Sequence, residues 1–212
     1  MVTRLIEGHE RFRKQQLQDE RELYASLARG AQRPLALFIA CCDSRVVPNI
    51  IVAANPGDLF VLRNIANIVP PFGAEGGSDR SVGAAVEYAV HVLEVPHIVV
   101  CGHTGCGGLR ALVDGPDNVR ADMPSLATWL DDAIAVLGRL RTRALEGDAL
   151  LRQLVFENVV VQLENLLTYP VVSRALEGGR LEMHGWVYDL TDASLRAYHP
   201  EENEFRPVEA SV

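Results

Sequence analysis

Basic residues are scarce in this sequence relative to acidic ones. The 212 residues include 20 Lys and Arg against 28 Asp and Glu, which gives a formal net charge of −8 at pH 7. The arginines are scattered among acidic residues and form no basic stripe. Because binding to nucleic-acid phosphates needs a clustered basic surface, this balance argues against nucleic acid as a main partner.

Long hydrophobic runs are also missing. Apolar stretches such as PLALFIACC are far shorter than the roughly 20 residues that span a bilayer. The N-terminal segment MVTRLIEGHERFRKQQ has neither the apolar core nor the small-residue cleavage site of a secretory signal. We therefore expect a soluble cytoplasmic protein without a membrane partner.

Cysteine is rare, and no internal repeat or low-complexity tract occurs. A chain of this length without a signal is not expected to depend on a disulfide framework, so metal binding, catalysis and simple burial remain open for its cysteines. A hydrophobic content of 48% fits one globular domain over residues 1–212. The four cysteines are Cys41, Cys42, Cys101 and Cys106.

Short apolar segments and helical spacing predict an α/β fold. Segments 35–42, 58–64 and 97–102 read as buried strands, and segment 81–95 reads as a helix that is apolar on nearly every side. That helix would be buried, in the core or against a second subunit. Strands of this kind separated by a helix indicate a mostly parallel sheet flanked by helices on both faces.

The remaining segments are predicted as helices and a hairpin. Leu5, Ile6, His9 and Phe12 lie at helical spacing and predict an amphipathic N-terminal helix that rests on another surface. Further patterns predict a helix over 122–140 with Asp122 as its cap and Pro124 in its first turn, a helix over 149–170, and a C-terminal hairpin that joins 180–190 to 194–200.

The stretch ACCDSRV at residues 40–46 raises the question of what two adjacent cysteines do. Side chains alternate along a strand, so Cys41 and Asp43 share one side and Cys42 points to the other. Cys41 and Asp43 lie at the carboxyl end of a predicted parallel strand, where the functional sites of open α/β sheets are found. His103 and Cys106 follow the 97–102 strand and can converge on the same end.

Cys41, His103 and Cys106 together would form a Cys₂His set, which suits zinc and leaves one coordination position open, as in catalytic sites. Three other interpretations of these residues remain open. Cys41 could be a small buried hydrophobe, GHTGCGG could be a phosphate-binding loop, and Cys101 could complete a closed Cys₃His site. We expect Cys42 and Cys101 to be core residues.

The two motifs resemble those of the β-class carbonic anhydrases. CCDSR is followed about 60 residues later by GHTGCGG, and the segments PGDLFVLRNIANIVPP, GAAVEYAV and LEMHGWVYDL are also similar to that family. The resemblance covers nearly the whole chain. It implies a mostly parallel sheet flanked by helices, an N-terminal helical arm over 1–30 that embraces a neighbouring subunit, and a homodimer or a larger homo-oligomer such as a tetramer or octamer.

The resemblance further implies that Cys41, His103 and Cys106 hold Zn²⁺ and that the reaction is the reversible hydration of CO₂ to bicarbonate and a proton. Zinc lowers the pKa of bound water and so supplies hydroxide near neutral pH. Two thiolates neutralise the zinc charge, so we expect a less acidic water than in a three-histidine site and an activity that rises into the alkaline range.

By the same resemblance, Asp43 and Arg45 are the catalytic pair. Arg45 would keep Asp43 ionised and turned away from zinc, where it accepts a hydrogen bond from the zinc-bound hydroxide; a free Asp43 could close the site as a fourth ligand. Gln32 lies nine residues before Cys41, where the open, plant-like subclass has Gln. Phe38 lies three residues before Cys41, where the bicarbonate-inhibited subclass has Trp. Both residues favour the open subclass. The implied substrate contacts are Gln32, Phe60, Ile65, Tyr88 and Gly107, with Phe60 and Tyr88 reaching the partner's site.

Two alternatives to CO₂ hydration remain open at this stage. The same zinc chemistry can act on carbonyl sulfide or carbon disulfide, and a closed zinc site can simply brace a non-catalytic protein. No proton shuttle is named, because Val92 stands where some plant relatives have a histidine. His9, His97, His184 and His199 have no assigned role.

Overall fold

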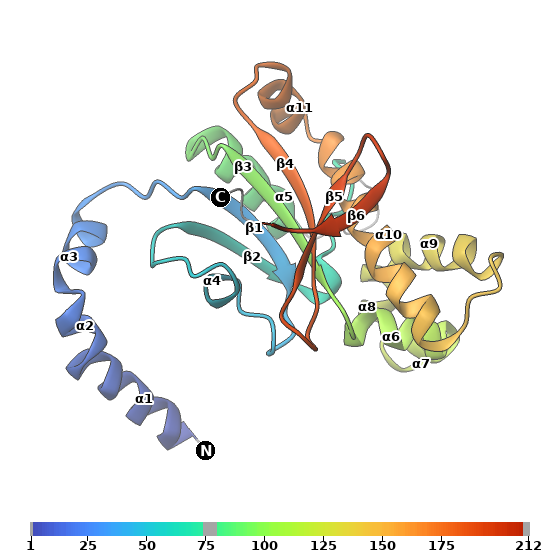
Figure 1. The fold of residues 1–212 in the computed structure, drawn as a ribbon, viewed down its shortest axis with the longest axis horizontal. Helices are drawn as coiled ribbons and strands as arrows, with labels where there is room; N and C mark the ends of the chain where they lie inside the picture. The colour runs from blue at the N-terminus through green and yellow to red at the C-terminus, as the bar shows by residue number, and fades with distance from the viewer. Residues whose placement is uncertain (1, 74–79, 210–212) are drawn as a thin grey trace. The chain divides into compact units, whose positions relative to one another are not determined.

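The computed structural model of the chain describes residues 2–73 and 80–209, and no helix in these ranges is long and apolar enough to cross a membrane. By its internal contacts the chain divides into two units, Met1–Arg33 and Pro34–Val212. The first unit consists of three helices, α1 (Val2–Lys14), α2 (Gln16–Asp19) and α3 (Arg21–Arg29), coloured blue in Figure 1.

The N-terminal unit confirms the expected amphipathic helix. Phe12 of α1 packs edge-on against Tyr24 of α3, with their ring centroids 5.5 Å apart. The other apolar side chains of α1 remain exposed in this single chain, with Leu5 at 74% and Ile6 at 56% of their full accessibility. Leu5 and Ile6 therefore leave an apolar surface on α1 that its own unit does not cover.

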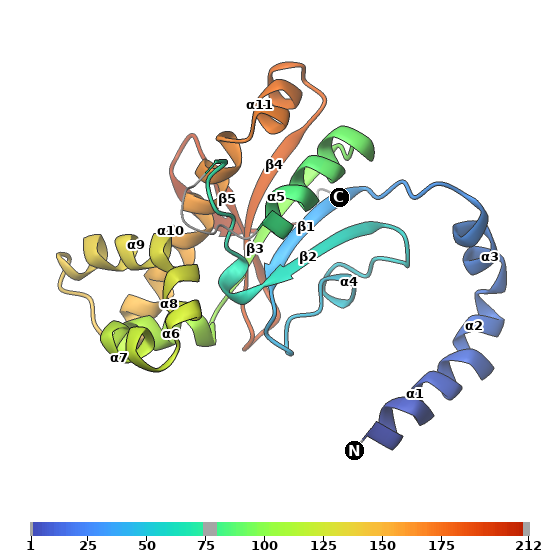
Figure 2. The same cartoon turned by 180° about the vertical axis from the view of Figure 1, so that it is seen from behind.

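The second unit is built on a six-stranded mixed sheet with the strand order β2-β1-β3-β4-β5-β6 (Figure 2). The first four strands in this order are parallel, and β5 and β6 add to them antiparallel. This arrangement confirms the three predicted strands, the mostly parallel sheet and the C-terminal hairpin; β6 was not predicted. The strands are β1 (Ala36–Cys41), β2 (Leu59–Asn64), β3 (His97–His103), β4 (Glu182–Tyr188), β5 (Leu195–His199) and β6 (Glu204–Pro207).

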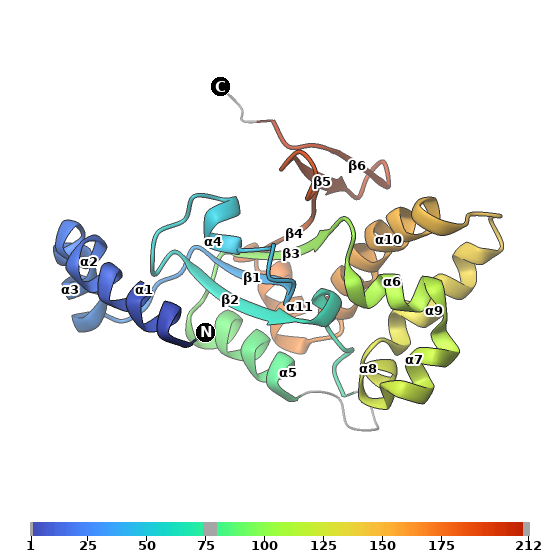
Figure 3. The same cartoon turned by 90° about the horizontal axis from the view of Figure 1, so that it is seen from below.

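The alternation of side chains along β1 divides the core between the two faces of the sheet. Leu37, Ile39 and Cys41 point into a large cluster formed with α5, α6, α9, α10 and α11, whereas Phe38 and Ala40 point into a smaller cluster that Ile51 of α4 joins. Figure 3 shows α4 on the side of the sheet opposite to α5. The helices of this unit are α4 (Pro48–Ile51), α5 (Arg80–Glu87), α6 (Gly107–Asp114), α7 (Pro116–Asp122), α8 (Pro124–Trp129), α9 (Asp131–Arg141), α10 (Gly147–Leu167) and α11 (Pro170–Glu177).

Two helix predictions need correction. The single helix expected over 122–140 is two helices, α8 and α9, which meet at Leu130, and Asp122 is the last residue of α7 rather than a cap. The helix expected over 81–95 ends its α-helical part at Glu87 and continues as a π-helical turn. In that turn the N–H of Leu93 donates to the carbonyl of Tyr88 at 3.0 Å.

The helix over 81–95 is also less buried than its composition suggested. Val82, Val86 and Ala89 are fully buried against the sheet, but Tyr88 and Val92 keep 44% and 57% of their accessibility. Only one side of this helix faces the core of its own chain. The other side presents apolar side chains at the surface of the unit.

Candidate metal centre and active site

Three predicted ligands meet at the carboxyl ends of two neighbouring parallel strands. Cys41 is the last residue of β1, His103 is the last residue of β3, and Cys106 directly precedes α6. Their ligand atoms all lie within 4.8 Å of one another, and all three residues are buried. The pairing of β1 with β3 thus brings together residues that are 62 and 65 positions apart, as expected from the carboxyl ends of neighbouring parallel strands.

The histidine presents a free nitrogen to the two cysteines. Nδ1 of His103 lies 3.0 Å from the carbonyl oxygen of Thr104. A carbonyl only accepts, so Nδ1 carries the proton and Nε2 carries the lone pair. His103 Nε2 is buried and has no hydrogen-bond partner in the described part of the chain. A buried polar atom without a partner is costly, and a metal ion at this position removes that cost.

The two sulfur atoms are placed as zinc ligands require. The Sγ atoms of Cys41 and Cys106 are 4.0 Å apart, close to the separation of about 3.8 Å that a tetrahedral angle and Zn–S bonds of about 2.3 Å produce. The hydrogen bond from Cys106 lowers the pKa of the Cys41 thiol against the opposing effect of burial. The Ala66 N–H also donates to Cys41 Sγ, at 3.4 Å. Two thiolates and an imidazole fit zinc.

Asp43 and Arg45 form the expected ion pair beside these ligands. Arg45 Nε donates to Asp43 Oδ1 at 2.9 Å, and Arg45 Nη2 donates to Oδ2 at 2.7 Å. The hydrogen bonds from Arg45 hold the pKa of the Asp43 carboxyl well below its usual range. Asp43 Oδ2 lies 4.0 Å from His103 Nε2, so the carboxylate faces the centre while Arg45 holds both of its oxygens.

A second arginine, which the sequence did not point out, fixes the turn that carries Asp43. Arg63 of β2 donates through Nε to the carbonyl of Cys41 at 2.9 Å and through Nη2 to the carbonyl of Asp43 at 2.7 Å. Its guanidinium therefore joins the end of β1 to the following turn. The available signal was a basic residue directly after the apolar run LFVL in the predicted strand.

The loop after β2 is held against the centre by polar side chains of α10, which the sequence reasoning also missed. Asn158 donates through Nδ2 to the carbonyl of Ala66 at 3.0 Å, and Gln162 Oε1 accepts from the N–H of Val69 at 2.7 Å. Both side chains are fully buried, and Gln162 donates to Asn158 at 3.1 Å. Ala66 and Asn67 adopt left-handed backbone conformations, with φ of 62° and 49°.

The predicted substrate residues lie in three places. Ile65 directly precedes Ala66, and Gly107 begins α6 directly after Cys106, so both adjoin the metal-binding set. Phe60 and Tyr88 pack against each other with ring centroids 5.9 Å apart. Gln32 belongs to the N-terminal unit and is described only within it.

The two remaining cysteines behave differently from each other. Cys101 is buried on the opposite face of the sheet, in the cluster of Phe38 and Ala40, and is absent from the metal-capable set of the described residues. The closed Cys₃His alternative was therefore wrong. Cys42 is exposed, so its expected place in the core was also wrong. It lies one residue past the end of β1, and its N–H still donates to the carbonyl of Asn64 in β2 at 2.9 Å.

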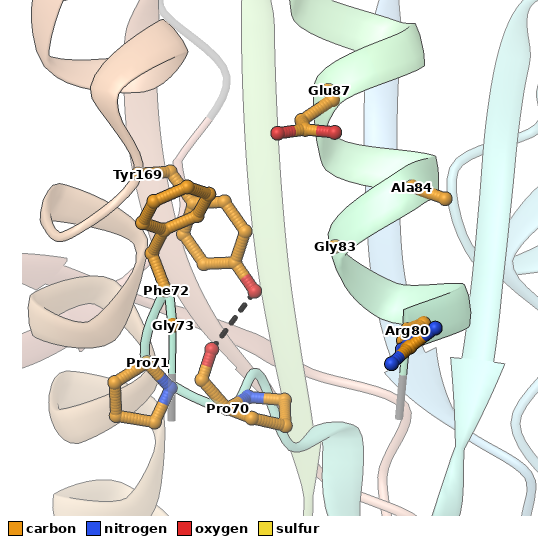
Figure 4. A pocket seen from close by; sticks show the side chains of 9 residues that line it. All are labelled: Pro70, Pro71, Phe72, Gly73, Arg80, Gly83, Ala84, Glu87 and Tyr169. Atoms are coloured by element: carbon orange, nitrogen blue, oxygen red, sulfur yellow. Dashed lines mark hydrogen bonds between the residues drawn. The ribbon is translucent and has the colours of Figure 1, made fainter. Parts of the chain in front are cut away.

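A groove lies between α5 and residues 70–73, and none of the predicted site residues lines it. It encloses about 340 Å³ and is lined in part by Pro70, Phe72, Arg80 and Tyr169. Figure 4 shows the Tyr169 hydroxyl donating to the Pro70 carbonyl across its wall, at 2.9 Å. Because Tyr169 follows α10, this bond extends the attachment of the loop to the helix that holds Ala66.

Comparison with known proteins identifies the family to which this arrangement belongs. The sequence pattern of the family described as Carbonic anhydrase matches residues 36–195. A carbonic anhydrase of Pseudomonas aeruginosa is 46% identical over 195 residues, which span 91% of this chain and 86% of that protein. The chain belongs to the β-class carbonic anhydrases.

Solved β-carbonic anhydrase structures share the fold of the whole chain. The structure of the β-carbonic anhydrase CcaA aligns with a TM-score of 0.91 and 38% identity, covering 100% of this chain and 93% of that one. One of two tetrameric β-carbonic anhydrases from the filamentous ascomycete Sordaria macrospora aligns with a TM-score of 0.79 and 28% identity, covering 99% and 97%. The chain is thus an enzyme of the carbonic anhydrase class.

Proposed function

We propose that this chain catalyses the reversible hydration of CO₂ to bicarbonate and a proton at a zinc ion held by Cys41, His103 and Cys106. The observation that carries the proposal is the buried Cys₂His set, in which His103 Nε2 has no other partner in the described part of the chain. A zinc ion held there supplies a Lewis acid that makes water ionise near neutral pH.

Asp43 is proposed to orient the attacking water. Its carboxylate is ionised because Arg45 donates to both of its oxygens, and an ionised carboxylate can only accept. It therefore accepts a hydrogen bond from the reacting water and fixes the direction of the oxygen lone pair toward CO₂. Arg45 acts through Asp43 and is a positioning residue.

The same pair supports an open centre in which Asp43 is not a metal ligand. A carboxylate held at two points by a guanidinium loses two charge-assisted hydrogen bonds when it turns away. The Arg45 Nη2 atom also donates to the Gly105 carbonyl at 3.3 Å, which ties the pair to the loop between His103 and Cys106. We infer that the chain belongs to the open, plant-like subclass.

The substrate is proposed to bind between apolar walls and a few donors. Ile65 supplies one wall, because it adjoins the Ala66 N–H that contacts Cys41. The Gly107 N–H and the Gln32 side-chain amide are proposed to donate hydrogen bonds to the substrate oxygens. CO₂ carries no charge, so an apolar pocket with few donors suits it.

A homo-oligomer, a dimer or larger, is proposed to complete this pocket, with Phe60 and Tyr88 contributed to the partner's site. Exposed apolar side chains on two separate elements support this: Leu5 and Ile6 of the helical arm, and Tyr88 and Val92 after α5. Tetramers are described for the Sordaria macrospora relative. A cytoplasmic location is proposed as well, and the four free cysteines support it.

Stopped-flow CO₂ hydration on a preparation of measured zinc content tests the proposal. We expect one zinc ion per catalytic site and an activity that rises with pH into the alkaline range. Asp43→Asn should keep its zinc and its fold and lose most of its activity. Zinc-loaded protein that does not hydrate CO₂, or that turns over carbonyl sulfide or carbon disulfide faster than CO₂, contradicts the proposal.

A further inference from the structure

A second cluster of metal-ligating side chains lies outside the active site, at the start of β3 and β4. His97, Glu182 and His184 each offer one ligand atom, and these atoms lie within 4.8 Å of one another. We propose that His97, Glu182 and His184 form a second binding site, for a divalent transition-metal ion. The site is independent of CO₂ hydration.

The backbone of two parallel strands places these ligands together. His97 and Glu182 are the first residues of β3 and β4 and are direct partners in the ladder between them. The Glu182 N–H donates to the Pro96 carbonyl at 2.9 Å, which fixes the register at this end. Side chains two residues apart on a strand share a face, so His184 projects on the same side as Glu182 and His97.

The ligand atoms have separations that a metal ion requires. His97 Nδ1 and His184 Nε2 are 3.2 Å apart. Glu182 Oε2 lies 3.7 Å from His97 Nδ1 and 3.8 Å from His184 Nε2. Tetrahedral bonds of about 2.0 Å to nitrogen and oxygen place ligand atoms about 3.3 Å apart. The two nitrogens already fit, and a small rotation of the Glu182 side chain closes the remaining distance.

The protonation chemistry of the two histidines also favours an ion. Two neutral imidazoles that face each other can place only one proton between their facing nitrogens, and a metal ion can take the place of that proton. The neutral imidazole is the form that binds metals.

The surroundings leave the site open on one side and supported on the other. The side chains of His97 and His184 are 43% and 35% exposed, so solvent can supply the remaining ligands. On the inner side the His184 ring lies 6.4 Å from the ring of Trp186, which packs edge-on against Phe38 at 6.0 Å. Two imidazoles and one carboxylate favour zinc, nickel or copper over magnesium or calcium.

The second site is separate from the catalytic centre. His97 and His103 are the two ends of the seven-residue strand β3. At about 3.3 Å per residue these ends are roughly 20 Å apart. Neither centre shares a ligand with the other, so loss of the second ion should leave the catalytic zinc in place.

Counting zinc in the intact protein tests this site. The wild-type chain and the variants His97→Asn, His184→Asn and His199→Asn are dialysed against micromolar zinc and analysed by mass spectrometry of the metal. His199 lies on β5, outside the cluster, and its variant is the matched control. We expect two ions per chain in wild type and in His199→Asn, and one in the other two. The second ion should also raise the melting temperature of wild type but not of His184→Asn.

A spectroscopic measurement on the wild-type protein tests the site without relying on variants that could misfold. Nickel is added to wild-type protein that holds one zinc ion per chain, and the nickel X-ray absorption edge is recorded. A nitrogen and oxygen shell with imidazole scattering is the expected result. A single ion per chain in wild type, two ions in His184→Asn, or sulfur in the nickel shell would overturn the proposal.

Discussion

The Arg45 guanidinium binds both carboxylate oxygens of Asp43, which precedes it by two residues. Nε donates to Oδ1 at 2.9 Å and Nη2 donates to Oδ2 at 2.7 Å. The Arg45 backbone N–H adds a third bond, to Asp43 Oδ1 at 3.0 Å. These bonds leave the carboxylate little freedom to rotate toward the cysteines. The position of a single acid beside the metal ligands thus depends on a base that is itself largely exposed, at 58% of its side chain.

Replacing Arg45 with Met should therefore damage catalysis without unfolding the protein. A released Asp43 can turn toward the metal, and a displaced catalytic group costs on the order of 10²-fold in rate. An exposed ion pair contributes little to stability, so the fold should persist. Stopped-flow kinetics and urea unfolding measure both effects. Arg45→Lys keeps the positive charge but cannot bind both carboxylate oxygens, so its rate should lie between those of wild type and Arg45→Met. A fully active Arg45→Met would refute the proposal that Arg45 positions Asp43.

Asn158→Leu should weaken the loop that contacts Cys41. The substitution keeps the side chain's approximate size but leaves the Ala66 carbonyl and Gln162 Nε2 without their bonds, and each unsatisfied buried group costs about 1–3 kcal/mol. We expect a lower free energy of unfolding and faster loss of zinc to a chelator. The control is Glu164→Ala, at an exposed position of the same helix, with a change of about 0.5 kcal/mol or less.

Gly108→Ala should displace the side chain of Ile65, which is proposed as one wall of the substrate pocket. A Cβ at Gly108 would lie 2.6 Å from Ile65 Cγ2, and overpacking of this kind costs roughly 1–3 kcal/mol. Both CO₂ hydration and thermal stability should fall. Gly138→Ala in α9 meets no atom within 4 Å and should instead stabilise the helix by roughly 0.5–1 kcal/mol. Equal stability changes in the two variants would contradict the packing argument.

Cys42 should be the cysteine that alkylating reagents reach first. It is exposed, whereas burial keeps Cys101 inaccessible and raises its thiol pKa to about 12. A zinc ion bound as proposed would protect Cys41 and Cys106, since their thiolates would be its ligands. Mass spectrometry of native zinc-loaded protein treated with iodoacetamide should find one modification, absent from Cys42→Ser. Labelling of Cys101 before unfolding would show that its strand opens.

Stability should fall as the pH drops below about 6.5, partly through His184. Burial and the facing His97 lower the pKa of His184 in the folded state, with Glu182 opposing. Between the folded and unfolded pKa values the unfolded chain binds more protons, so acid favours unfolding. Urea unfolding at pH 8 and pH 5.5 should show a larger loss for wild type than for His184→Gln. An equal loss would mean that His184 does not contribute.

Much of the active site follows from local sequence pattern. Alternation along LALFIACCD predicted that Cys41 and Asp43 share one side, and the apolar runs identified the parallel strand whose end carries them. The hydrophobic pattern could not indicate Arg63, Asn158 or Gln162. Their roles are hydrogen bonds to backbone atoms 20 or more residues away, and such partners have no periodicity in the sequence.

The sequence by itself determined the type of fold and a candidate set of metal ligands, because strand alternation and ligand chemistry are local properties. The roles expected of Asp43 and Arg45 came from the resemblance of the motifs to a known family. Only the tertiary structure decided where a strand stops and which side chains meet. Cys42 is exposed one residue past the end of β1, and Cys101 is separated from Cys41 because the two side chains lie on opposite faces of the sheet. The meeting of His97 with His184 depends on the register of β3 with β4, which the packing of the whole sheet sets.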